Sequence, residues 1–307
     1  MALPKSYLKY PKRKKGMDHD LYPYSNMFER TPVAWPKNKN VALWVTVALE
    51  YFPLTSNNET PFKAPGNMVT PYPDYRTYTA REYGNRVGIY RILKAFDKLG
   101  IKASFPTNAA LAKRYPFLIE EIAKRGHEFI GHGTDMNALH WGGMDIDVEH
   151  KQIKSALDGL RKATGQDVSG WLSPARSESQ NTLALLAEQG IEYACDWVND
   201  DMPYMIGEGE KLIAMPHTME LDDHQLLVNL GQNEKTWQEQ ILTAFDLLHR
   251  ESKIHGGRIL HISLTPYVIG QAWRIKALRD TLEILIETGW VWNATGAEIA
   301  AEWRSQQ

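Results

Sequence analysis

The feature that most constrains this fold is a repeated alternation of short apolar runs with amphipathic helical patterns. The first run, "VALWVTVALE" at 41–50, is uninterrupted up to its single carboxylate, Glu50, which is typical of a parallel strand buried on both faces. Further strands are expected over 101–108, 127–133, 168–174, 191–197, 211–216, 257–266 and 289–295. Helices are expected over 86–100, 115–126, 145–165, 179–190, 234–252 and 273–289. The alternation predicts a sheet of about seven parallel strands covered by helices.

The size and the missing nucleotide motifs favour one barrel. The chain has 307 residues, of which 43% are hydrophobic, enough for one large core. No Gly-x-Gly-x-x-Gly follows the first strand and no phosphate-binding loop appears, so a closed or nearly closed α/β barrel is favoured over a doubly wound sheet. We expect one barrel domain over 41–307, preceded by an extended arm, 1–40, rich in Pro, Lys and Tyr. The segment 51–80 holds five prolines and is expected to be an ordered loop that covers the site as a lid.

Composition argues against several classes of partner. A net charge of −2 gives no strong field for nucleic acid or an anionic membrane, and no apolar segment of spanning length or secretory leader is expected. The single cysteine, Cys195, excludes an internal disulfide and favours the cytoplasm. The expected partner is a small-molecule substrate. The arm is expected to cross to a neighbouring copy in a homo-oligomer.

Candidate catalytic residues follow from the rule that α/β barrels carry their chemistry at the carboxyl ends of the strands. The first strand ends at Glu50, the third at His132, and the next at Ser173, with Arg176 just beyond. We interpret Glu50 as a general base assisted by His132, and Arg176 as a clamp for a carboxylate or an oxyanion. The structural alternatives are an ion pair between Glu50 and Arg86 or Arg176, and a hydrogen-bonded core position for His132.

Two later strand ends add candidates. The strand 191–197 ends near Asp196, which is expected to orient Arg176 or His132, and three polar residues follow it. The strand 257–266 carries His261 and Thr265 on one face, because strand side chains alternate. His127 begins its strand and is expected to be structural. The candidate substrate-binding residues are Tyr51, Asp135, His140, Trp141, Ser173, Asn199, Asp200, Asp201, His261, Thr265 and Tyr267.

Five ordered motifs carry a resemblance to a known family. They are "REYGNRVGIYRILKAFDKLGIKASF", "YPFLIEEIAKRGHEFIGHG", "GWLSPARSES", "CDWVNDDMPY" and "SLTPYVIGQAWRI". Over about residues 40 to 303 the chain resembles the polysaccharide deacetylase superfamily, the NodB-homology carbohydrate esterase fold, and in particular its allantoinase-like and peptidoglycan-deacetylase-like branch. The resemblance implies a deformed (β/α) barrel.

The chain departs from the pattern of the metal-dependent members at three places. Their first motif ends a strand with aspartates, where this chain has Glu50. Their second motif carries two metal-binding histidines four residues apart, where this chain has His132 and then Met136. Their late "SLHP" reads "SLTP" here, with Thr265 in place of the histidine. The allantoinase-like branch also lacks the second histidine, and this resemblance implies hydrolysis without a tightly bound metal.

Three functional hypotheses remain open at this point. The first is hydrolysis of a carbon–nitrogen bond other than a peptide bond in a small amide, cyclic imide or ureide, with no cofactor or a weakly bound divalent metal such as zinc. The second is a metal-dependent deacetylase of an N-acetylated sugar, with Glu50, His132 and either Asp135 or His140 as ligands. The third is a degenerate member with a binding role, or with another reaction such as a lyase.

Overall fold

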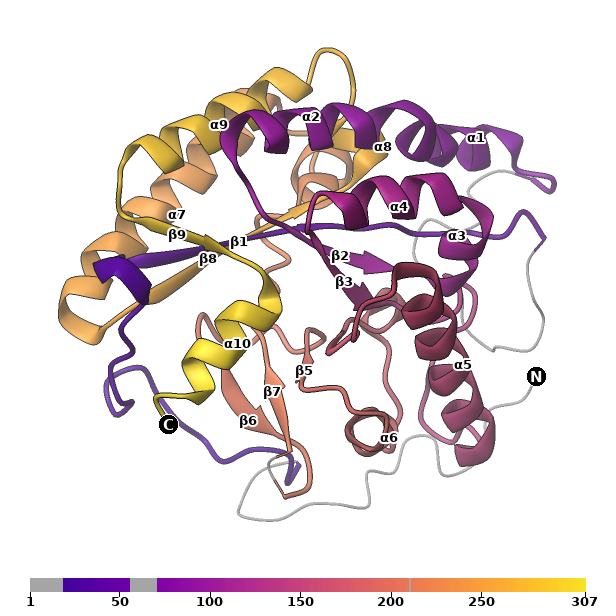
Figure 1. The fold of residues 1–307 in the computed structure, drawn as a ribbon, viewed down its shortest axis with the longest axis horizontal. Coiled ribbons are helices and arrows are strands. Elements are labelled where there is room, and N and C mark those ends of the chain that lie inside the picture. The colour runs from indigo at the N-terminus through magenta and orange to yellow at the C-terminus, as the bar shows by residue number, and fades with distance from the viewer. Residues whose placement is uncertain (1–18, 56–70, 210) are drawn as a thin grey trace.

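The strands curl into a half-barrel with helices on the outside (Figure 1). A computed structural model describes residues 19–55, 71–209 and 211–307. The strand order is β6-β7-β5-β4-β3-β2-β1-β8, with β9 also pairing with β1, and every printed pair is parallel except β6 with β7. The strands are β1 (Val41–Val47), β2 (Ser104–Thr107), β3 (Glu128–Gly131), β4 (Gly170–Trp171), β5 (Tyr193–Ala194), β6 (Tyr204–Ile206), β7 (Leu212–Ala214), β8 (Arg258–Leu264) and β9 (Val291–Ala294).

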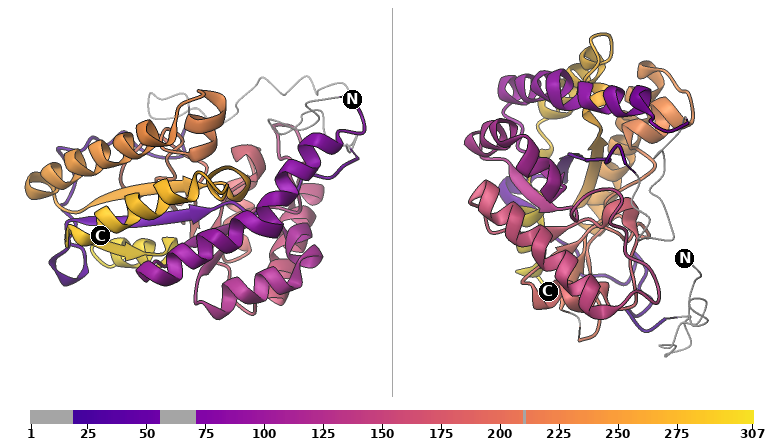
Figure 2. Two further views of the ribbon diagram at one scale, coloured as in Figure 1. Left: turned by 90° about the horizontal axis from the view of Figure 1, so that it is seen from above. Right: turned by 90° about the vertical axis from the view of Figure 1, so that its right-hand side faces the viewer.

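The helices form the outer layer, where α7 and α9 run side by side (Figure 2). The α-helices are α1 (Tyr75–Tyr83), α2 (Ile89–Leu99), α3 (Ala109–Arg114), α4 (Pro116–Lys124), α5 (Ile146–Thr164), α6 (Thr182–Glu188), α7 (Glu234–His255), α8 (Pro266–Ile269), α9 (Ile275–Glu287) and α10 (Gly296–Arg304). Short 3-10 or π turns are η1 (Pro36–Asn38), η2 (Gly84–Gly88), η3 (Pro174–Arg176) and η4 (Gln225–Asn229).

Local sequence explains why these elements form where they do. All seven residues of β1 are buried, as the continuous apolar run predicts for a strand packed on both faces. Helix α5 begins where the Asp145 side chain accepts the amide hydrogens of Asp147 and Val148, and it ends at Gly165 in the left-handed region. Helix α10 begins with a capping box between Thr295 and Glu298.

The expected deformed (β/α) barrel is confirmed, but two details differ. The structure has nine strands among the described residues. The strand that was not expected is β6, "YMI", which begins at the last residue of the motif "CDWVNDDMPY" and pairs antiparallel with β7. The segment expected as a loop over 51–80 is helical from Tyr75, where the Asp74 side chain caps α1. The part of the expected lid over 56–70 lies outside the described residues.

The described part of the arm, 19–40, packs along the barrel wall and reaches the amino ends of the strands. The buried Trp35 indole donates to the backbone carbonyl of Arg258, at the start of β8. The amide of Ala34 donates to the Gln306 side chain near the C-terminus. The expected crossing to a neighbouring copy remains a prediction, and residues 1–18 lie outside the described part.

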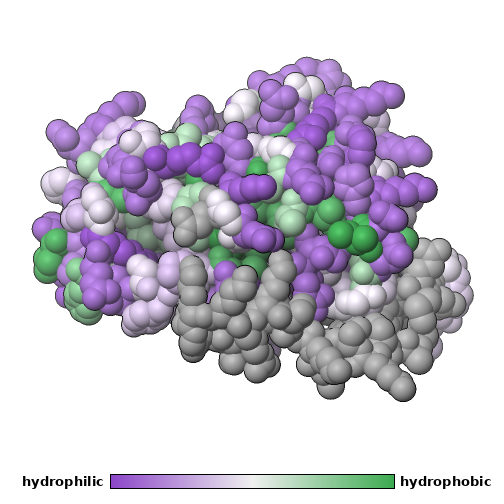
Figure 3. All heavy atoms as spheres, turned by 90° about the horizontal axis from the view of Figure 1, so that it is seen from below, coloured by the Kyte–Doolittle hydropathy of each residue, from purple (hydrophilic) through white to green (hydrophobic). Residues whose placement is uncertain are grey.

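Hydrophilic residues predominate on the face of the molecule drawn in Figure 3. Within the described ranges, the chain has no helix whose length and apolar content would suffice to span a membrane.

Candidate active site

A pocket of about 330 Å³ opens at the carboxyl ends of the barrel strands. Its volume falls at the lower end of the range typical of small-molecule sites. Strand ends and the loops that follow them supply its walls, as the barrel rule predicts. Its lining residues are Ala48, Glu50, Phe52, Arg81, His132, Met136, Leu172, Ser173, Ala175, Arg176, His217, Met219, Asp222, His224, Asn229, Ser263, Thr265 and Tyr267.

Strand alternation explains how β1 contributes to the pocket. Trp44 and Thr46 point into the barrel below the pocket, and the residues two and four positions beyond Thr46, Ala48 and Glu50, line it. The sequence therefore places one carboxylate at the mouth, above an apolar and hydroxyl-bearing floor.

Strand β8 runs parallel to β1 and repeats the same arrangement. Trp44 is paired in register with His261, and Thr46 is paired with Ser263. His261 lies on the floor, whereas Ser263 and Thr265 line the pocket. His261 therefore supports the site from below and does not reach the mouth.

His132 is held in one orientation with one nitrogen left open. Its Nδ1 lies 2.6 Å from the backbone oxygen of Leu172, which can only accept, so Nδ1 carries the hydrogen. Its Nε2 is buried without a hydrogen-bond partner and lies 3.8 Å from Oε1 of Glu50. That separation is too long for a direct hydrogen bond. In a neutral ring, Nε2 offers its lone pair to the pocket.

Arg176 is fixed at the pocket wall by acceptors on two sides. Its Nη1 donates to the carbonyl of Cys195 at 2.7 Å, and its Nη2 donates to Nδ1 of His217 at 2.6 Å. Arg176 and its neighbour Ala175 both have positive φ, of 53° and 55°, a strained conformation that tends to persist at functional sites.

The arginine fixes a chain of buried hydrogen bonds behind it. His217 accepts from Arg176 at Nδ1, so its Nε2 carries the hydrogen and donates to Thr46 at 3.1 Å. His261 accepts from the amide of Thr218 at Nδ1 and donates to the same hydroxyl at 2.9 Å. Burial lowers the pKa of both imidazoles well below the usual histidine value, which keeps both rings neutral.

His217 was missed at the sequence level, although a signal existed. It follows the expected strand 211–216, and the strand-end rule that selects Glu50 and His132 applies there too. The expected strand extends to Pro216, whereas the observed strand covers only Leu212–Ala214.

The loop "ELDDHQ" at 220–225 is also part of the site, although three carboxylates and a histidine in one loop are typical of a solvated surface. Asp223 is fully buried and accepts the amides of Thr265 at 2.8 Å and Ile269 at 3.2 Å. Asp222 lines the pocket and accepts the Ser263 hydroxyl at 2.7 Å. These carboxylates fix the turn that follows β8.

Three of the predicted residues lie in the pocket wall or directly behind it. Ser173 lines the pocket, and its hydroxyl accepts the Trp171 indole hydrogen at 2.9 Å. Asp196 lies behind that wall, where its Oδ1 accepts the amide hydrogen of Ser173 at 2.8 Å. Tyr267 lines the rim, and burial raises the pKa of its phenol.

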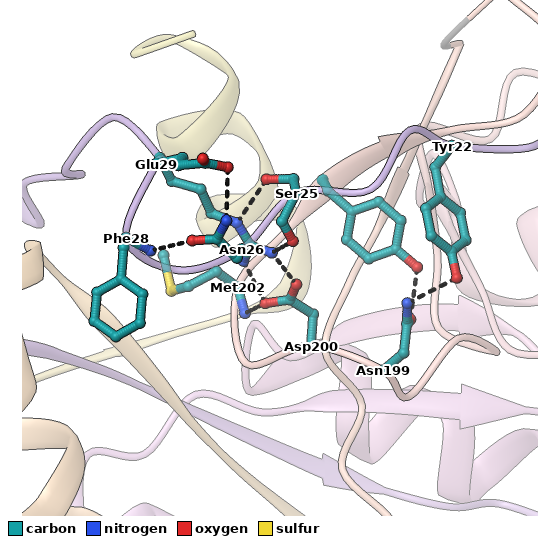
Figure 4. Close-up of polar contacts among 10 residues, drawn as sticks. Tyr22, Ser25, Asn26, Phe28, Glu29, Asn199, Asp200 and Met202 are labelled. Atoms are coloured by element: carbon teal, nitrogen blue, oxygen red, sulfur yellow. Dashed lines mark hydrogen bonds and ion pairs between the residues drawn. The ribbon is translucent and has the colours of Figure 1, made fainter. Parts of the chain in front are cut away.

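Asn199 and Asp200 lie away from this pocket, against the N-terminal arm (Figure 4). Asp201 lies beside Asp200, where both line a second pocket together with Arg30 of the arm. Asp200 forms a bidentate ion pair with Arg30, at 2.5 and 2.6 Å. Asn199 bonds the hydroxyls of Tyr22 and Tyr204. After Asp196 the chain turns away from the barrel mouth toward β6, and these three residues lie in that connection.

The remaining predicted residues support loops around the mouth. Asp135 accepts the amides of Asn137 and Ala138, and Tyr51 donates its amide to Asn108. His140 is buried with Nδ1 3.0 Å from Glu149, a fully buried carboxylate. Trp141 is half-buried on the same loop and is not among the pocket-lining residues.

The donor set at the mouth does not fit a resident tetrahedral zinc ion. Glu50 and His132 supply two donors, whereas a catalytic zinc site takes three from the protein. Met136 lines the pocket at the position where a second histidine would stand, and Asp135 and His140 are engaged elsewhere. Across residues 19–55, 71–209 and 211–307, no three His, Cys, Asp or Glu side chains are grouped to hold an ion.

Comparisons with known proteins agree with this architecture. Residues 82–194 match the family model for polysaccharide deacetylase. A Schizosaccharomyces pombe protein named after the polysaccharide deacetylases is 24% identical over 242 residues, which are 73% of this chain and 75% of that protein.

Solved structures extend the similarity to almost the whole chain. The Puue allantoinase structure has a TM-score of 0.79 and 26% identity, and the match covers 92% of this chain and 98% of that one. A polysaccharide-deacetylase-type structure from Pseudomonas aeruginosa PAO1 has a TM-score of 0.79 and 25% identity, covering 93% and 99%. The fold is a deformed half-barrel of the NodB type. Residues 82–194 are similar to the polysaccharide deacetylase family, and the structural neighbours include a polysaccharide-deacetylase-type protein and an allantoinase.

Proposed function

We propose that this protein hydrolyses a carbon–nitrogen bond other than a peptide bond in a small amide, cyclic imide or ureide. The observation that carries the proposal is the buried, unpartnered Nε2 of His132 beside the Glu50 carboxylate. A pocket of about 330 Å³ matches a small substrate, and the structural likeness to an allantoinase supports a ureide or cyclic imide.

In the proposed reaction, Glu50 and His132 activate one water molecule. The water donates one hydrogen toward the carboxylate and the other toward Nε2 of His132, because both atoms are acceptors. Its oxygen attacks the substrate carbonyl carbon while His132 takes the proton. The imidazolium then gives that proton to the leaving nitrogen as the carbon–nitrogen bond breaks.

Arg176 stabilises the negative oxygen of the tetrahedral intermediate. Two of its five N–H bonds are used on Cys195 and His217, and others remain for the substrate. Fixed donors of this kind stabilise a developing oxyanion without reorganising during the reaction. Thr265 can hydrogen-bond the substrate but cannot act as the acid, which leaves proton delivery to His132.

The first test is a substrate panel with one substitution at Glu50, which orients the attacking water. Amides, cyclic imides, ureides and N-acetyl sugars are assayed with the wild type, Glu50→Gln and the control Glu120→Gln, an exposed carboxylate on α4. We expect a small amide, imide or ureide to be hydrolysed, with kcat lowered about 10²- to 10⁴-fold in Glu50→Gln and unchanged in the control. Equal turnover by Glu50→Gln would remove Glu50 from the activation of the water molecule.

A second measurement separates this proposal from the metal-dependent deacetylase. The same assays are repeated after chelation, together with elemental analysis of the untreated protein. We expect turnover to survive chelation. Stoichiometric metal together with chelator-sensitive cleavage of an N-acetyl sugar would support the alternative, and tight ligand binding without turnover would indicate a binding protein.

A further inference from the structure

The guanidinium of Arg176 reaches the candidate active site held by uncharged acceptors alone. Its Nη1 donates to the carbonyl of Cys195 at 2.7 Å, and its Nη2 donates to Nδ1 of His217 at 2.6 Å. In the described part of the chain, no ion pair joins it to a carboxylate. Burial lowers the pKa of Arg176, but a guanidinium stays charged at neutral pH. A largely buried cation without a counter-ion is costly, so this arrangement requires an explanation.

The acidic groups whose charges act on Arg176 are engaged elsewhere or lie in solvent. Oδ1 of Asp196 accepts the amide of Ser173, and its Oδ2 has no hydrogen-bond partner in the described ranges. Both oxygens of Asp222 accept from its own loop and from β8. Glu220 is exposed. These carboxylates act on the guanidinium only at longer range, and none of them forms a direct contact that would offset its charge.

We propose that His217 is the residue that positions Arg176 in the pocket, and that its neutral imidazole does so without offsetting the guanidinium charge. A carboxylate in the same place would also fix the arginine, but it would form an ion pair with it. An arginine that is already paired attracts a developing oxyanion less strongly. The role in catalysis rests on the proposed function, whereas the neutral contact does not depend on it.

The opposite side of the His217 ring fixes which of its nitrogens accepts. Its Nε2 lies 3.1 Å from the Thr46 hydroxyl, and the same hydroxyl lies 2.9 Å from Nε2 of His261. Nδ1 of His261 accepts the amide of Thr218, so its Nε2 carries the hydrogen. Thr46 therefore accepts one hydrogen from each ring, through its two lone pairs. This arrangement leaves Nδ1 of His217 as the acceptor that Arg176 requires.

The surroundings of His217 keep its ring neutral, which the contact requires because a protonated ring has no lone pair at Nδ1. Burial lowers the pKa of His217 well below the usual histidine value, and His261, Arg176 and His132 act in the same direction. The side chains that face the ring from β1 are uncharged. The contact is therefore maintained at neutral pH.

The neutral contact is tested without any substrate by NMR spectroscopy of the ¹⁵N-labelled protein. The signals of the His217 ring are assigned by their loss in His217→Asn. We expect the neutral form with its hydrogen on Nε2 from about pH 6 to pH 8, where an ordinary histidine changes its charge. A hydrogen on Nδ1, or a ring that titrates with an ordinary histidine pKa, would overturn the proposal.

The importance of the charge is tested by two variants of the same shape. His217→Asn places an amide oxygen near the position of Nδ1, and His217→Asp places a carboxylate oxygen there, so both can accept from Arg176. On the substrate found by the panel, we expect kcat of His217→Asn to stay within about tenfold of the wild type. We expect kcat of His217→Asp to be at least about tenfold lower again, with KM little changed, because the ion pair weakens oxyanion stabilisation. Equal kcat values in the two variants would overturn the charge argument.

A third variant tests the positioning itself. His217→Leu has no acceptor for Arg176, so we expect kcat to fall about 10²- to 10³-fold, as when a donor to the oxyanion is lost. The control is His249→Asn, at a half-buried ring on α7 away from the mouth, and its kcat should be unchanged. Wild-type kcat in His217→Leu would overturn the positioning role.

Binding of a small anion separates a failure of this proposal from a failure of the proposed function. Acetate is titrated into the wild type, His217→Asn and His217→Asp, and the histidine signals at the pocket are followed. We expect His217→Asp to bind acetate at least about tenfold more weakly than His217→Asn, because its arginine is already paired. Equal or undetectable binding in all three proteins would overturn the available charge. A panel with no hydrolysed compound would overturn the proposed function, and the NMR and acetate results would still decide the contact and the charge.

Discussion

A polar side chain lies at each end of strand β3, and the two differ in how fully they are hydrogen-bonded. At the amino end, Glu128 is half-buried and its carboxylate accepts from Ser104, from the Tyr193 hydroxyl at 2.6 Å, and from the first two amides of α10. Four residues later, past the carboxyl end, His132 presents a buried Nε2 that receives and donates nothing.

The difference shows how this barrel separates stability from chemistry. A buried polar group costs free energy unless it is hydrogen-bonded, so a saturated carboxylate such as Glu128 is what a structural end requires. An unsatisfied nitrogen such as Nε2 of His132 persists where a ligand or water completes it. Parallel strands expose their carboxyl ends to the loops, which is why the open group lies there.

The largest effect is expected from a substitution that removes Nε2 of His132 but keeps the hydrogen bond to Leu172. In His132→Asn, the side-chain amide can still donate to the Leu172 carbonyl in place of Nδ1, but no atom replaces Nε2. We expect kcat/KM to fall about 10²- to 10⁴-fold, because the proton acceptor is lost, with little change in the unfolding free energy. Steady-state kinetics and chemical denaturation of the same preparation measure both.

A matched variant tests whether Nε2 is the group that matters. In His132→Gln, the amide reaches the Nε2 position and gives up the Leu172 bond. It cannot take a proton, so its activity should be as low as that of His132→Asn. An active His132→Asn would place the proton acceptor elsewhere.

The next largest effect is expected at the amino end of β3, where the Glu128 carboxylate is fully hydrogen-bonded. Glu128→Ala leaves the hydrogen-bond donors of Ser104, Tyr193 and the α10 amides unpaired and creates a cavity. We expect about 3 kcal/mol loss of unfolding free energy, with normal kcat in the fraction that remains folded. Urea denaturation measures the stability, and active-site titration measures the folded fraction. A large loss of kcat with unchanged stability would contradict a purely structural role for Glu128.

The sequence could predict the half-barrel and the core of the candidate site because both depend on local patterns. The apolar run 41–50 identifies a doubly buried strand, and its end identifies Glu50. The same reasoning reaches His132 and Arg176, which the structure brings to one pocket. Their roles stay predictions until tested.

The rest depended on contacts that local patterns do not encode. Asn199, Asp200 and Asp201 follow a strand end, but the antiparallel turn into β6 and the distant arm residue Arg30 place them elsewhere. Asp222 and Asp223 look like solvated loop acids until the amides after β8 are seen to surround Asp223. Such pairings join residues far apart in sequence, so composition and periodicity contain no trace of them.

The smallest expected effect concerns a charged cluster that resembles a site but is saturated like the amino end of β3. Arg30 pairs with Asp200, and the two side chains are 24% and 16% exposed. Replacing Arg30 by Ala should cost about 1 kcal/mol of unfolding free energy at most, because partly exposed pairs offset their attraction with desolvation and lost side-chain freedom. Asp200→Ala should cost more, since Asp200 also accepts the amide of Met202. A double-mutant cycle isolates the pair itself.

Neither variant should change kcat, because this cluster lies against the arm and not at the mouth. A fall in kcat with either variant would mean that the arm communicates with the mouth, and the separation between structural and open polar groups would then not hold for this part of the molecule.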